Sequence, residues 1–67
     1  MVILAVLGAE EDRIQLRVYN TIVEMVHYTE GKGELYEELS VSAYKPGLYL
    51  VTTLVGDTLL QDYVLIK

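Results

Sequence analysis

His27 is the only histidine of the chain and its only side chain that can act as a base near neutral pH. A nucleophilic site would also need a Ser or Cys beside the base and a carboxylate to orient the imidazole ring. The chain contains no Cys, and His27 stands between Val26 and Tyr28 in a run typical of a β-strand. We therefore interpret His27 as a solvent-facing or hydrogen-bonded strand residue, and we expect no enzymatic activity.

The remaining polar clusters do not have the spacing of a chemical site. Glu37 and Glu38 are adjacent, so in a strand they point to opposite faces and cannot act as paired carboxylates. Glu10-Glu11-Asp12 lacks the alternating ligands and central Gly of a calcium loop and is interpreted as a solvated turn. Gly31-Lys32-Gly33 is too short for a phosphate loop and indicates a hairpin turn.

No catalytic, cofactor-binding or metal-ligating residue is predicted. Disulfide bonds and Cys/His zinc sites are excluded by the absence of Cys and the single His. The chain has six Tyr but no Phe or Trp. Because the Tyr side chains fall mostly within expected strands, packing at the edge of the core is the first interpretation and ligand stacking is the alternative.

Length and charge restrict the class of protein. A chain of 67 residues makes one domain, and its 52% hydrophobic residues are too many for a disordered segment. A net charge of −5 without a basic cluster argues against a nucleic-acid partner. The apolar run 1–9 has no preceding Lys or Arg and is too short to span a membrane, so we expect a buried strand there. So apolar a chain is also expected to self-associate, because it is too short to bury all its apolar residues.

The sequence predicts six strands, and these would position the residues discussed above. Runs rich in β-branched and aromatic residues, separated by Gly, Pro and acidic turns, predict them. The expected strands are 2–7, 14–20, 23–29, 35–43, 48–55 and 59–66. The last two, joined by Gly56-Asp57, form the clearest hairpin.

Residues 10–28 allow two interpretations. Alternation of apolar and polar residues from Ile14 to Tyr19 indicates a strand. Apolar residues also recur there at helical spacing, so a helix over 10–28 in an α+β fold is the alternative. We favour strands because β-branched and aromatic residues are frequent in this segment.

Pro46-Gly47 interrupts the pattern and starts a new strand. Beyond it, Tyr49 and Val51 share one face of the strand, whereas Leu48 and Leu50 share the other. Since both sets are apolar, this pattern predicts a strand that is buried on both faces.

The C-terminal part of the chain shows a family resemblance. The run Glu38-Leu39-Ser40-Val41-Ser42-Ala43-Tyr44-Lys45-Pro46-Gly47-Leu48-Tyr49-Leu50-Val51, the Gly56-Asp57 turn and the ending Tyr63-Val64-Leu65-Ile66-Lys67 resemble the C-terminal sorting domain of the Bacteroidetes type IX secretion system. Residues 14–21 look like that family's Val-Tyr-Asn strand, so the resemblance covers about residues 14–67. The chain departs from the family at Ile22-Val23-Glu24, where a Gly is usual, and it lacks the Asn-Pro element.

The resemblance implies a small antiparallel Ig-like β-sandwich. It implies residues 1–67 as a single β domain, which would be a trimmed C-terminal module of this family. It implies a non-catalytic sorting module that is recognised by an outer-membrane secretion machinery. The module would be secreted or held at the cell surface. The residues implied in recognition or in shaping the motif are Pro46, Gly47, Tyr49, Val51, Gly56, Asp57 and Lys67. The alternative is a structural or self-associating β scaffold, natural or engineered. In either case we expect a protein partner, which would be the secretion machinery or a second copy of the chain, or else fusion to a cargo domain. We expect no cofactor.

Overall fold

The computed structural model describes residues 2–67, except for the side chain of Val41. Six strands and one short 3-10 turn make up the fold. They are β1 (Val2–Leu7), β2 (Arg13–Tyr19), β3 (Met25–Lys32), β4 (Glu34–Leu39), η1 (Val41–Ala43), β5 (Gly47–Val55) and β6 (Thr58–Ile66).

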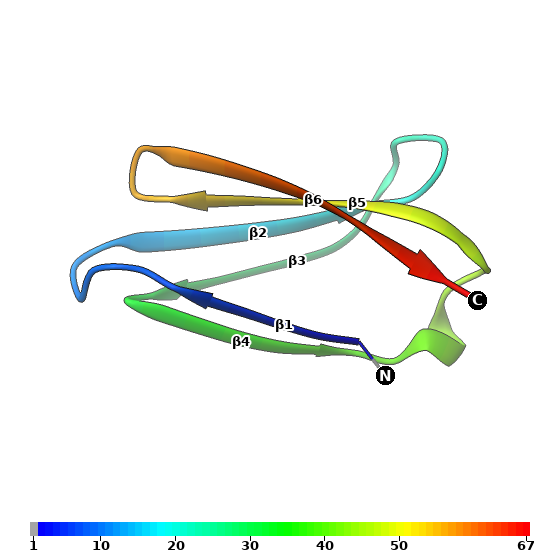
Figure 1. The fold of residues 1–67 in the computed structure, drawn as a ribbon, viewed down its shortest axis with the longest axis horizontal. Helices are drawn as coiled ribbons and strands as arrows, with labels where there is room; N and C mark the ends of the chain where they lie inside the picture. Colours follow the sequence, from blue (N-terminus) through cyan, green and yellow to red (C-terminus); the bar gives the residue numbers. More distant parts are fainter. Residues whose placement is uncertain (1) are drawn as a thin grey trace.

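The six strands form two packed layers. Their order is β1-β4-β3-β2-β5-β6, and each neighbouring pair is antiparallel. The strands β3 and β4 pair only at Lys32 and Glu34, and beyond this point they diverge. The ribbon β1–β4 therefore folds over the inner face of the β3-β2-β5-β6 sheet (Figure 1). The predicted small all-β sandwich is confirmed.

The core lies between these two layers. In β2, Ile14, Leu16 and Val18 are between 0% and 1% exposed, while the alternate residues face outward. The core cluster comprises Leu16, Val18, Leu39, Tyr49, Val51 and Ile66, with Val2, Leu4, Val6, Leu35, Tyr44 and Val64 packed against it. The alternation predicted for β2 is thus confirmed.

The alternative of a helix over residues 10–28 is wrong, because this segment forms β2 and the first half of β3. Burying every second residue of β2 gives each side of the strand its own environment, which a helix could not do with this pattern.

The β2–β3 loop closes without glycine. The Asn20 carboxamide oxygen accepts hydrogen bonds from the amides of Ile22 (3.1 Å) and Glu24 (2.9 Å). Val23 adopts a positive φ of 62°, and its amide donates to the Asn20 carbonyl at 3.0 Å. Asn20 therefore holds the loop in a shape for which Gly is the usual residue.

Two strands, β3 and β4, differ in extent from expectation. The fourth strand ends at Leu39 instead of Ala43, and residues 41–43 form η1, whose Ala43 amide donates to the Ser40 carbonyl at 3.0 Å. Leu39 is the last core residue of β4, so the chain turns away there to reach the Pro46 corner. The third strand begins at Met25 and runs through Lys32, which leaves Gly33 alone between β3 and β4.

Asp12 forms hydrogen bonds that connect two turns at one end of the sandwich. Its carboxylate accepts a hydrogen bond from the Ala9 amide at 3.0 Å, and its carbonyl accepts one from Gly33 at 2.8 Å. The acidic segment 10–12 is thus a turn, as predicted, and one of its carboxylates is structural.

Candidate recognition surface

The Pro46-Gly47 corner is built around Tyr49. The Tyr49 hydroxyl donates a hydrogen bond to the Lys45 carbonyl at 2.6 Å, and its ring packs edge-on against Tyr44 with centroids 5.7 Å apart. Gly47 has a φ of 154°, which residues with a Cβ rarely adopt. Tyr49 and Val51 are each 5% exposed, so these two motif residues hold the core and do not face a partner directly.

The other motif residues lie at the two ends of the β5–β6 hairpin. Gly56 and Asp57 form the exposed turn, where Gly56 has the left-handed φ of 58° typical of a two-residue hairpin. Lys67 is exposed and follows Ile66, which pairs with Gly47 at the opposite end. The nine residues of β5 separate the two groups by about 30 Å at roughly 3.3 Å per residue. The structure therefore brings Gly47 and Lys67 near each other, and Gly56 and Asp57 to the far end.

The outward side of this hairpin is apolar at three of its four cross-strand pairs, and the fourth pair is Thr52 with Gln61. Cross-strand neighbours pair Leu48 with Leu65, Leu50 with Tyr63 and Leu54 with Leu59. We call these six side chains the hairpin face. Four of them are 50% to 64% exposed: Leu48, Leu59, Tyr63 and Leu65.

The hairpin face corrects one prediction. The strand after Pro46-Gly47 is buried on one face only, because Leu48 is half exposed and no strand or helix among residues 2–67 covers that side. Apolar residues on both faces of β5 and β6 could have signalled either a second buried face or an exposed surface. The sequence motif pointed to Tyr49 and Val51, and sequence reasoning missed Leu59, Tyr63 and Leu65 as surface residues.

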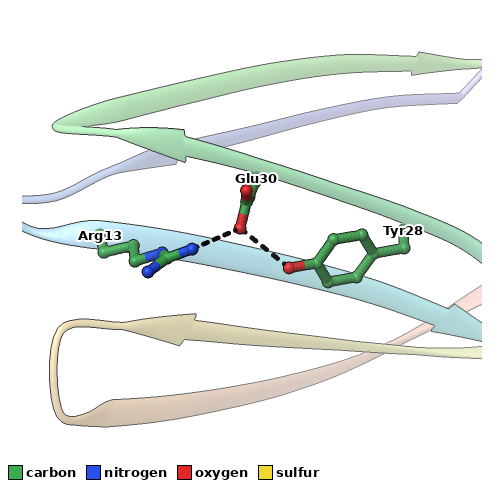
Figure 2. Close-up of polar contacts among 3 residues, drawn as sticks. All are labelled: Arg13, Tyr28 and Glu30. Carbon is green, nitrogen blue, oxygen red and sulfur yellow. Dashed lines mark hydrogen bonds and ion pairs between the residues drawn. The ribbon is translucent and has the colours of Figure 1, made fainter.

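The same side of the sheet is charged over β2 and β3. Arg13 and the Tyr28 hydroxyl both donate to one Glu30 carboxylate oxygen, Oε2, at 3.1 Å and 3.0 Å (Figure 2). The Arg13 hydrogen bond and then that of Tyr28 lower the pKa of Glu30, while the bond to Glu30 raises the pKa of Tyr28. The Arg17 guanidinium lies 5.2 Å from the centre of the Tyr28 ring. An apolar strip over β5–β6 therefore adjoins a polar strip over β2–β3.

His27 lies away from this surface. Its Nε2 is buried 3.3 Å from the Glu37 Oε1, at an angle that does not make a hydrogen bond, so the contact is a close polar approach between the two layers. Glu37 and Glu38 do point to opposite faces, and the Tyr36 hydroxyl donates to Glu38 at 3.2 Å, which raises the pKa of Tyr36.

Among residues 2–67, no group of three or more His, Asp or Glu side chains is placed to hold a metal ion. Within the same range, no helix has the length and apolar character needed to cross a membrane.

Comparison with protein-family models, curated proteins and solved structures finds no match to this chain. The sorting-domain resemblance therefore stands on the sequence motifs alone.

Proposed function

We propose that this chain is a non-catalytic recognition module that a protein partner binds on the hairpin face. In the form that the sequence resemblance suggests, the module is Ig-like, is carried by an exported protein and is bound by the type IX secretion machinery at the outer membrane.

The observation that supports this proposal is the exposure of the hairpin face. Exposed apolar groups that lie together mark interaction sites, and Tyr is enriched at protein interfaces. Tyr63, at 64% exposed, sits in the middle of this surface opposite Leu50. Pro46, Gly47, Tyr49 and Val51 then shape the hairpin, while the exposed Lys67 and the Gly56-Asp57 turn flank the surface at its two ends.

Export of a reporter tests the sorting proposal. The chain is fused to the C-terminus of a reporter in a bacterium with the type IX system, and the secreted fraction is measured. Deleting β6 would not separate a loss of recognition from a loss of folding, because β5 would lose the strand with which it pairs. Tyr63→Lys places a charge on the hairpin face and is expected to abolish export without unfolding the domain.

Tyr36→Lys is the matched control, since Tyr36 is 60% exposed on β4, outside the hairpin. This variant is expected to be exported like the unmodified fusion. Retention of the unmodified fusion in the cell, or normal export of Tyr63→Lys, would refute the sorting proposal.

Self-association is a second candidate function, and strand β6 favours it. This edge strand pairs with β5 along all nine residues without a bulge, and Asp62 is its only charged residue. Long apolar edge strands are templates for pairing with another chain. We expect light scattering to show a homodimer that Tyr63→Lys dissociates and Tyr36→Lys does not. A stable monomer at high concentration would contradict this expectation.

A further inference from the structure

The side of the sandwich opposite the β3–β4 corner is open. There β1 and β6 face each other, and in the part of the chain that the structure describes they share no ladder. Because every successive pairing from β1 to β6 is antiparallel, β1 and β6 run in opposite directions (Figure 1). A groove of about 340 Å³ lies between them.

The groove opens onto the core. Its walls are residues 3–6 of β1 and, from β6, residues 60–62 with Val64. Its floor consists of Leu16, Val51 and Thr53, all at most 5% exposed. An occupant would therefore rest on apolar side chains and on one threonine.

The β6 wall presents its backbone to the groove. The Tyr63 amide donates to the Asp62 carboxylate at 2.8 Å, so this N–H group points away from β5. Backbone direction alternates along an antiparallel strand, so the Gln61 amide points the same way. The edge of β6 is thus able to form hydrogen bonds with another strand.

We propose that this groove binds one extended peptide segment of a partner, which adds a strand between β1 and β6. Strand addition draws affinity from main-chain hydrogen bonds and specificity from alternate side chains. Every second side chain of the segment is apolar and lies on the floor. The chain carries a net charge of −5, which attracts a basic segment. The segment therefore carries its basic side chains at the outward-facing positions between the apolar ones.

This groove is distinct from the hairpin face, and two adjacent leucines of β6 allow each surface to be altered alone. Leu60 pairs with the buried Thr53 and lies on the groove side, whereas Leu59 pairs with Leu54 on the hairpin face. Both are well exposed, at 50% and 59%, so either position should accept a charge without unfolding the domain.

The test uses a dye-labelled seven-residue peptide in which valine alternates with lysine or threonine, and binding is followed by fluorescence anisotropy. Leu60→Lys is expected to weaken binding by at least about tenfold, and Leu59→Lys, with the same change in charge, by less than about twofold. Equal losses in the two variants, or no saturable binding of the unmodified chain up to about 1 mM peptide, would overturn the proposal.

A second pair of variants examines the backbone. Gln61→Pro removes the N–H group that faces the groove and leaves the ladder to β5 intact, as proline at a sheet edge can do. It is expected to weaken peptide binding at least about tenfold, while Gln61→Ala retains the amide and keeps binding within about twofold. A urea midpoint near that of the unmodified chain establishes that each variant is folded. If Gln61→Pro unfolds, the leucine pair decides. Neither outcome depends on export, and light scattering of each variant establishes that the compared proteins have the same oligomeric state.

Discussion

Val23 carries the clearest backbone strain among residues 2–67. It is the only non-glycine residue described with a positive φ, 62°, and it is β-branched. The left-handed conformation costs about 1–2 kcal/mol for an L-residue. The Val23 side chain is 71% exposed, so little packing compensates for this strain.

Val23→Gly is therefore expected to stabilise the protein. Relief of the strain, less the extra chain entropy that glycine loses on folding, leaves a gain of about 0.5–1 kcal/mol. For a domain of this size the melting temperature should rise by roughly 2–8 °C. Ile22 is equally exposed at 71% but lacks a positive φ, so Ile22→Gly is the control and should not stabilise. A lower melting temperature for Val23→Gly would show that the loop is not strained.

Glu30 is expected to make stability sensitive to acid. Its pKa lies below the usual 4.5, chiefly because Arg13 donates a hydrogen bond to it. A lowered carboxyl pKa stabilises the folded state above the unfolded value, and this contribution disappears as the pH falls through the lowered value. The effect is small, because Arg13 and Glu30 are solvent-exposed.

An NMR titration of Glu30 measures this directly. Arg13→Gln should return the Glu30 pKa toward its ordinary value, while Arg17→Gln should leave it nearly unchanged, since Arg17 does not contact Glu30. An unaltered pKa in Arg13→Gln would contradict the ion pair of Figure 2.

At the scale of elements, the Tyr49 hydrogen bond fixes the start of β5. Tyr49→Phe keeps the buried ring but leaves the Lys45 carbonyl without its donor, and it should reduce the free energy of unfolding by about 1 kcal/mol. Tyr49→Ala should cost about 3–5 kcal/mol, because it also empties part of the core. Urea denaturation measures both variants. Tyr63→Phe, at a 64% exposed position, is the control and should change stability by less than about 0.5 kcal/mol.

Local chemistry explains which elements the sequence predicted correctly. Gly56-Asp57 has the residues of a two-residue turn, and Ile14, Leu16 and Val18 alternate with polar residues, so both elements could be predicted. The Asn20 loop could not, because its left-handed position holds valine, and its stability depends on side-chain hydrogen bonds that no spacing reveals.

The candidate surface was predictable only in part. The Pro46-Gly47 motif located the hairpin, but β5 and β6 are apolar on both faces, so alternation could not tell the inner residues from the hairpin face. That distinction depends on where the β1–β4 ribbon folds, which is a tertiary property.

At the scale of the whole molecule, the sandwich is open and its core is small. The chain exposes 4672 Å², compared with about 4300 Å² for a typical folded monomer of 7.6 kDa. Its radius of gyration is 11.9 Å, compared with roughly 11 Å for a compact domain of this length. Both differences agree with the uncovered hairpin face and the groove between β1 and β6.

A small core implies a narrow stability margin. Leu16 is fully buried between the layers, so Leu16→Ala should cost about 2–5 kcal/mol, a large part of the roughly 5 kcal/mol expected for a marginally stable domain. Circular dichroism during urea titration should show this variant largely unfolded at low denaturant. Leu48→Ala, at a half-exposed position, should keep its midpoint within about 0.5 kcal/mol of the unmodified chain. A native-like midpoint for Leu16→Ala would mean that the core lies elsewhere.

The strand order also determines when each part of the molecule can form during folding. The hairpins β2–β3 and β5–β6 join neighbours in sequence, and such hairpins form within about 1–10 μs. By contrast, the β1–β4 and β2–β5 ladders pair residues that are far apart in sequence, such as Val2 with Leu39 and Ile14 with Val55. These two ladders form only after long loops have closed. This non-local topology places folding in the millisecond-to-second range. During synthesis, which proceeds from the N-terminus, the apolar strand β1 emerges before the other five strands and remains without its partner until β4 has been made.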